Sequence, residues 1–248
     1  MNGAESLART LVASGVEICF GNPGTSEMHF VSALDRVAGL RCVLGLAETV
    51  VTGCADGYAR MAGKPAATLL HCGPGLGNGI ANLHNARRAH APLVNIVGDH
   101  ATWHRPHDPP LAADTEGLAR AVSHWVRTSA SARSVGPDAA AAVQAARTPP
   151  GQIATLILPA DCAWDEGAEP GAPLAPPGRT QVAPEIVTNI ARTLHARAPA
   201  MLVLSGEALT ERGLRAAQRV AQATGARLRT PTQVPRVAPG SEIGRAHV

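Results

Sequence analysis

The sequence predicts an α/β protein: a parallel sheet flanked by helices, followed by the start of a second, Rossmann-like α/β domain. Short apolar runs alternate with longer stretches in which small and apolar residues recur at helical spacing. The chain is 45% hydrophobic but only 2% aromatic, so its elements must pack through small side chains. Strands that are covered by helices on both faces account for both observations.

The elements follow in order along the chain. Apolar runs predict five strands in the first domain, at 16–20, 41–46, 66–71, 92–99 and 152–161. Helical spacing predicts the helices between them, at 3–15, 26–37, 48–63 and 77–90. We therefore expect the first domain over 1–165. The Pro-, Gly- and Ala-rich stretch 166–184 predicts an interdomain linker, and 185–241 predicts the opening of a second domain.

The last seven residues, 242–248, read EIGRAHV and have neither helical nor strand periodicity. This heptapeptide resembles the translation of a common sequencing adapter. We expect a non-native tail on a truncated gene product, with the genomic reading frame continuing beyond Ser241. A short disordered tail is the alternative interpretation.

Charge and composition exclude several classes of protein. The formal net charge is only +3 and the arginines form no basic stripe, which argues against nucleic acid as a partner. No apolar run approaches the ~18 residues of a membrane span, and the N-terminus does not resemble a signal peptide. The five cysteines include no C-x-x-C pair, which favours reduced thiols. We expect a cytoplasmic protein with no membrane partner.

Four glycines lie within 73–79, directly after an expected strand, as in a dinucleotide-binding turn. However, the third glycine of the G-x-G-x-x-G fingerprint falls on Asn78, Ile80 or Asn82 in the three possible registers. An NAD-dependent oxidoreductase is therefore only an alternative. The glycines still predict a turn that a ligand can approach closely, beside a helix N-terminus. A tight structural turn is the other interpretation.

Three motifs carry a resemblance to a known family: FGNPGTSE at 20–27, GLAETVVTGCADGYARMAGKPA at 45–66 and LLHCGPGLGNGIANLHNA at 69–86. In this order and spacing they resemble the pyrimidine-binding domain of thiamine diphosphate enzymes of the acetolactate synthase and benzoylformate decarboxylase group, over about 3–165. The resemblance implies a lyase or transferase that decarboxylates 2-keto acids, with either protonation or carboligation. It implies Mg²⁺ in a diphosphate-binding domain beyond this chain, so we expect this stretch alone to be inactive. Whether the second domain binds FAD stays open.

The resemblance also implies roles for individual residues. In this family a glutamate hydrogen-bonds N1′ of the cofactor's aminopyrimidine, which favours the imino tautomer that removes the proton from C2. Glu48 occupies that place and is implied to be catalytic and cofactor-binding. His71 stands where the decarboxylase branch carries an active-site histidine and is implied to be catalytic and substrate-binding. Thr25 corresponds to a substrate-contacting hydroxyl. The other implied cofactor-binding residues are Pro23, Gly73, Gly75 and Asn78.

Structural interpretations of the same residues remain open. A glutamate at a helix start is often a surface residue, and a lone histidine at a strand end is more often structural. A non-catalytic subunit that keeps the pyrimidine-binding fold is a further alternative. The sequence also departs from the acetolactate synthase motifs, with GTS in place of a GGA turn and VGD in place of a glycine followed by Gln. The decarboxylase branch is therefore nearer by motif.

Two further patterns bear on partners and metals. Gly53 and Gly57 share one helical face, which in the resembled family lies near a dimer interface. This implies a homodimer or homotetramer with the active site between chains. Asp56 and Arg60 predict an i,i+4 ion pair on the same helix. The loop 99–108 holds three histidines and two aspartates, but without helical or hairpin spacing. We assign no metal to it.

Overall fold

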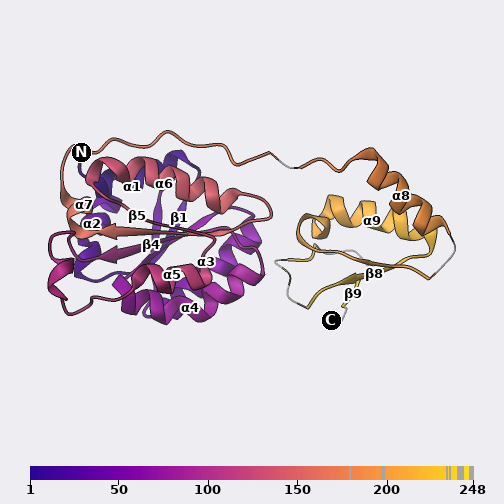
Figure 1. Ribbon diagram of the computed structural model, residues 1–248, viewed down its shortest axis with the longest axis horizontal. Coiled ribbons are helices and arrows are strands. Elements are labelled where there is room, and N and C mark those ends of the chain that lie inside the picture. The colour runs from indigo at the N-terminus through magenta and orange to yellow at the C-terminus, as the bar shows by residue number, and fades with distance from the viewer. Residues whose placement is uncertain (179, 197–198, 233, 235, 239–242, 246–248) are drawn as a thin grey trace. The chain divides into compact units, whose positions relative to one another are not determined.

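The computed structural model describes residues 1–178, 180–196, 199–232, 234, 236–238 and 243–245 (Figure 1). The chain divides into two compact units, Met1–Pro176 and Pro177–Val248. Among the described residues, no helix combines the length and apolar character that crossing a membrane requires.

The first unit is built on a six-stranded parallel sheet with strand order β2-β1-β3-β4-β6-β5. Its strands are β1 (Ile18–Asn22), β2 (Arg41–Leu44), β3 (Ala66–Leu70), β4 (Leu93–Asp99), β5 (Trp125–Thr128) and β6 (Ile153–Pro159). Strands β3, β4 and β6 are buried along their whole length, as apolar runs covered on both faces require. The predicted parallel sheet is confirmed.

Helices cover both faces of this sheet (Figure 1). One core cluster joins the sheet to α1 (Gly3–Ala13), α2 (Met28–Arg36), α6 (Ala132–Arg147) and α7 (Ala160–Trp164). The other joins it to α3 (Glu48–Ala62), α4 (Cys72–Arg88) and α5 (Thr115–Val122). Two short 3₁₀ helices, η1 (Thr25–Glu27) and η2 (Arg105–His107), lie in the loops after β1 and β4.

The glycine-rich segment 73–79 lies inside α4 and is not the turn that the sequence predicts. Helix α4 begins at Cys72, directly after β3, and its glycines let α3 pack closely against it. A Cβ atom on Gly79 would lie 2.9 Å from Thr52 Cγ2 of α3, and one on Gly53 would lie 3.1 Å from Asn82 Nδ2 of α4. The helical conformation persists because close packing offsets the low helix propensity of glycine.

The stretch that the sequence predicts as a linker begins as part of the first unit. Ser6 Oγ of α1 donates a hydrogen bond to the Glu169 carbonyl at 2.7 Å. Gly171 N donates to Thr10 Oγ1 at 2.8 Å, and Gln144 Nε2 of α6 donates to the Ala175 carbonyl at 2.7 Å. Side chains of two helices thus hold 169–175 in place.

The second unit contains a parallel sheet with order β7-β8-β9. Its elements are α8 (Pro184–His195), β7 (Met201–Val203), η3 (Gly206–Leu209), α9 (Glu211–Thr224), β8 (Arg227–Thr230) and β9 (Gly244–Arg245). Of the expected tail 242–248, residues 242 and 246–248 lie outside the described residues.

Candidate active site

The candidate site lies at the carboxyl edge of the first sheet. Strands β1, β3 and β4 are neighbours and run parallel, so the segments that follow them meet at one edge. These segments carry Thr25 and Glu27 after β1, His71 and Cys72 after β3, and Asp99 after β4. Ligands of open α/β sheets bind at this edge.

Glu48 is the first residue of α3, and only 7% of it is exposed. Asn78 Nδ2 donates a hydrogen bond to Glu48 Oε2 at 3.1 Å. The other oxygen, Oε1, lies 3.0 Å from the place that a Cβ atom on Gly75 would take. The structure therefore brings Glu48, Gly75 and Asn78 together at the start of two helices, where backbone N–H groups favour negative charge.

The remaining residues expected to bind cofactor or substrate have different surroundings. A Cβ atom on Gly73 would lie 2.4 Å from Ala113 Cβ, so this glycine accommodates the chain's own loop. Pro23 is partly buried directly after β1, and Thr25 is exposed at the start of η1. Pro23 and Thr25 flank the same edge of the sheet as His71.

His71 forms a pair with Glu27, a residue to which the sequence analysis gave no role. His71 Nδ1 lies 2.8 Å from Glu27 Oε2, and Glu27 is 2% exposed. Gly24 N also donates to Glu27 Oε2, at 2.8 Å. A carboxylate oxygen accepts hydrogen bonds, so His71 Nδ1–H is the donor of this pair, and Nε2 is the ring nitrogen that Glu27 does not engage.

Two glycines make room for the Glu27–His71 pair. A Cβ atom on Gly98 of β4 would lie 1.6 Å from Glu27 Oε1, and one on Gly24 would lie 2.4 Å from His71 Nδ1. Any side chain at either position would displace the pair. Glu27 stands three residues after Gly24, which is the spacing of a capping box, and this local pattern points to a helix start rather than to a site.

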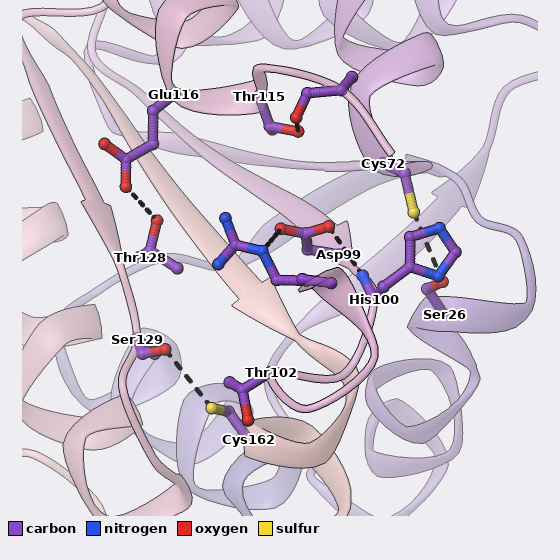
Figure 2. A network of polar contacts seen from close by, with 12 residues as sticks. Ser26, Cys72, Asp99, His100, Thr102, Thr115, Glu116, Thr128, Ser129 and Cys162 are labelled. Carbon is purple, nitrogen blue, oxygen red and sulfur yellow. Dashed lines mark hydrogen bonds and ion pairs between the residues drawn. The ribbon is translucent and has the colours of Figure 1, made fainter. Parts of the chain in front are cut away.

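Cys72 lies beside this pair as the first residue of α4. It is fully buried and has a positive φ of 50°. Its Sγ lies 3.4 Å from Ser26 Oγ (Figure 2) and 3.9 Å from Glu27 Oε1. Burial raises the pKa of the Cys72 thiol to about 12, so it is protonated at neutral pH.

The loop after β4 forms a pocket of about 460 Å³ whose lining includes Asp99, His100 and Arg105. His100 N donates to Asp99 Oδ1 at 2.8 Å, and Arg105 Nε lies 3.3 Å from Asp99 Oδ2. The rings of His100 and His104 meet edge to face, with centroids 5.5 Å apart. Within the part of the chain that the structure describes, the group of side chains close enough to hold a metal ion is elsewhere, at Glu27, His71 and Cys72.

The predicted ion pair on α3 is confirmed. Arg60 Nε donates to Asp56 Oδ1 at 2.7 Å, and Arg60 Nη2 donates to Asp56 Oδ2 at 2.5 Å. A bidentate pair at this spacing supports the helix by about 0.3–0.5 kcal/mol. The pair lies two turns or more beyond Glu48 on α3, and among the described residues its hydrogen bonds include no residue of the candidate site.

Comparison with known proteins shows which family this chain resembles. Residues 1–118 match the family described as thiamine pyrophosphate enzyme, N-terminal TPP binding domain. A Mycobacterium tuberculosis protein, provisionally named acetolactate synthase large subunit IlvX, is 56% identical over 227 residues, which are 92% of this chain and 44% of that protein. The benzoylformate decarboxylase of Pseudomonas aeruginosa is 34% identical over 79% of this chain and 35% of its own length.

A solved structure agrees with these sequence relatives. The thiamine diphosphate-dependent 4-hydroxybenzoylformate decarboxylase of Rhodococcus jostii RHA1 has a TM-score of 0.84 at 25% identity, over 93% of this chain and 44% of that chain. The chain therefore spans less than half the length of each of these three relatives.

Proposed function

The chain belongs to the family of thiamine pyrophosphate enzymes, and from this premise we propose that it is part of an enzyme that decarboxylates 2-keto acids, with Glu48 serving the cofactor. The observation that carries the proposal is the buried carboxyl group of Glu48 at the carboxyl edge of the sheet. The match is to a family that binds thiamine pyrophosphate rather than a dinucleotide, which disfavours the NAD-dependent alternative.

The residues present fit the aminopyrimidine ring of thiamine diphosphate. Glu48 provides a carboxyl group that can share a proton with a ring nitrogen, and Asn78 holds one of its two oxygens. Gly75 leaves the space beside the other oxygen free of a side chain. Pro23 and Gly73 border the same edge of the sheet and complete the proposed cofactor-binding set. When bound, thiamine diphosphate supplies a carbon nucleophile and an electron sink for decarboxylation.

The chain's own residues have separate tasks in this proposal. Glu48 holds and returns a proton at the ring nitrogen. His71 Nε2 accepts or delivers a proton at the substrate, because its Nδ1–H is engaged by Glu27. Glu27 is a positioning residue that fixes the orientation and tautomer of His71. The Thr25 hydroxyl, exposed at the start of η1, orients the substrate.

The comparisons favour 2-keto acids as the substrate class, because the relatives are named acetolactate synthase and benzoylformate decarboxylase. We propose that decarboxylation is followed by protonation or by carboligation of a second carbonyl compound. Mg²⁺ is the proposed ion that accompanies the diphosphate in the whole protein. The exposed free thiols of Cys42 and Cys54 favour a reducing, cytoplasmic compartment.

A second copy of the chain is the proposed partner of helix α3. Val50, Cys54, Gly57 and Met61 follow one another at helical spacing and are all exposed, with Val50 53% and Met61 65% exposed. Exposed apolar residues gathered on one helix face favour contact with a partner surface. Sedimentation velocity of the Val50→Glu variant should show dissociation, whereas Trp103→Glu, at a similarly exposed residue of another surface, should not. An unchanged assembly in Val50→Glu would refute this interface.

Cofactor binding and turnover test the proposed function. The protein encoded by the complete gene should release CO₂ from pyruvate or benzoylformate only when thiamine diphosphate and Mg²⁺ are both present. Isothermal titration of the same complete protein should detect binding of thiamine diphosphate that weakens in the Glu48→Ala variant. The proposal fails if the complete, folded protein binds no thiamine diphosphate.

A further inference from the structure

We propose that Glu27, His71 and Cys72 form a binding site for a soft divalent cation of the Zn²⁺ class. The three side chains come from η1 and from the junction of β3 and α4, and they offer one carboxylate, one imidazole and one thiol. Their ligand atoms all lie within 4.8 Å of one another. Cys72 and Glu27 are buried, so the group is enclosed by the fold rather than scattered over a surface.

The distances are close to those of a tetrahedral zinc site. Bonds of about 2.3 Å to sulfur and about 2.0–2.2 Å to nitrogen and oxygen place tetrahedral ligand atoms about 3.3–3.6 Å apart. In the structure the Glu27 carboxylate presents a different oxygen to each partner: Oε2 lies 2.8 Å from His71 Nδ1, and Oε1 lies 3.9 Å from Cys72 Sγ. For one oxygen to serve as the ligand, the Glu27 carboxyl group must reorient between the nitrogen and the sulfur.

The charges also match a divalent ion. Binding releases the Cys72 proton, and the thiolate together with the Glu27 carboxylate then neutralises two positive charges. A neutral complex avoids the cost of leaving a net charge buried. Sulfur and imidazole ligands favour Zn²⁺ over Mg²⁺, which prefers six oxygen ligands. The ion can therefore be distinguished from the Mg²⁺ that accompanies a diphosphate.

The site is reached from one side and has a hydroxyl group beside its sulfur ligand. The side chain of His71 is 25% exposed, whereas that of Glu27 is 1% exposed, so the ion enters from the His71 side. Ser26 Oγ lies 3.4 Å from Cys72 Sγ, which places a hydroxyl group next to the sulfur ligand (Figure 2). Three protein ligands and one water or hydroxyl complete a tetrahedral set.

The consequence for catalysis rests on the proposed function. An ion bound to His71 Nδ1 displaces the proton from that nitrogen to Nε2 and removes the hydrogen bond to Glu27. His71 then has no free acceptor nitrogen toward the substrate. Zn²⁺ should therefore inhibit turnover, and a chelator should restore it.

Cobalt is the probe for the site itself, because a thiolate bound to Co²⁺ gives a charge-transfer band that oxygen-bound Co²⁺ does not give. The protein encoded by the complete gene is loaded with thiamine diphosphate and excess Mg²⁺ and titrated with Co²⁺. We expect the band to saturate at one equivalent, to disappear on addition of Zn²⁺, and to be lost in Cys72→Ser. Cys162→Ser is the matched control, because Cys162 is also buried and burial raises its pKa to about 12 as well.

Other outcomes would overturn the proposal. They are a wild-type protein without the band, a band that survives in Cys72→Ser, and a band that is lost in Cys162→Ser. If Cys72→Ser does not fold, His71→Gln replaces it, because the His71 side chain is partly exposed. The affinity for Co²⁺ should then fall, and an unchanged affinity would overturn the proposal. The band does not depend on turnover, so it can be present when 2-keto acid decarboxylation fails, and the two proposals are tested separately.

Discussion

Glu48 Oε1 lies 3.0 Å from the position that a Cβ atom on Gly75 would occupy. The two residues come from different helices, α3 and α4, and meet where both helices begin. A methyl carbon at this distance from a carboxylate oxygen is closer than an ordinary van der Waals contact. Only glycine at position 75 therefore leaves the Glu48 carboxyl group in its present position.

Gly75→Ala should therefore displace the Glu48 carboxyl group. We expect a loss of about 1–3 kcal/mol in the free energy of unfolding from overpacking, together with weaker binding of thiamine diphosphate. Gly77→Ala is the matched control, because a Cβ atom there meets nothing within 4 Å on the same helix. That variant should be neutral or more stable by up to about 1 kcal/mol. Equal effects of the two substitutions in urea unfolding and cofactor titration would contradict the explanation.

Glu48→Gln should slow ionisation at C2 of the bound cofactor, because glutamine keeps the shape of the side chain but cannot share a proton with the ring nitrogen. General acid–base contributions of about 10²–10⁴-fold set the expected loss. The measurement is proton–deuterium exchange at C2 by NMR in the protein encoded by the complete gene. Glu27→Gln is the comparison, since Glu27 contacts His71 and should leave this exchange near the wild-type rate. The opposite pattern would mean that Glu27 carries the role proposed for Glu48.

The free energy of unfolding of the first unit should decrease as the pH is lowered from 7 to 5, because of His124. Partial burial lowers the pKa of His124, with a contribution from the positive charge of Arg87, and His124 Nδ1 accepts a hydrogen bond from Ile153 N at 3.2 Å. The unfolded chain then binds more protons than the folded one. The stabilisation is present above the unfolded pKa of about 6.5 and is lost as the pH falls toward the folded value.

Urea unfolding at several pH values measures this effect. His124→Asn should give a shallower dependence of the unfolding midpoint on pH over the same range, because no proton is taken up at this position. An identical pH dependence in the variant and the wild type would rule out His124 as a source of the slope.

As the pH is raised, Cys42 should be the first cysteine to become reactive toward an alkylating reagent. A hydrogen bond from the Cys19 thiol, its register partner on β1, lowers the pKa of Cys42 to about 7. The reactive thiolate therefore forms as the pH rises through 7. Iodoacetamide labelling followed by mass spectrometry should show this midpoint in the wild type and a higher one in Cys19→Ala. Labelling of Cys72 below pH 9 would contradict its raised pKa of about 12.

Local sequence patterns were sufficient for most of the architecture. Apolar runs located five of the six strands of the first unit, because strands buried on both faces must be apolar throughout. Strand β5 was not found, since it has four residues, lies at the edge of the sheet and keeps a partly exposed surface. The glycines at 73–79 were assigned to a turn, because glycine disfavours isolated helices and the packing of α3 on α4 cannot be seen in a local window.

The sequence by itself determined the fold class, the family motifs and the position of Glu48 directly after a strand-like run. It could not pair residues that lie far apart in the chain. The contact of Glu48 with Asn78, and that of His71 with Glu27 and Cys72, depend on the parallel order of β1, β3 and β4. Only the tertiary structure decided these contacts, because the strand order sets which strand ends become neighbours, and glycines 24, 75 and 98 set how closely the side chains approach.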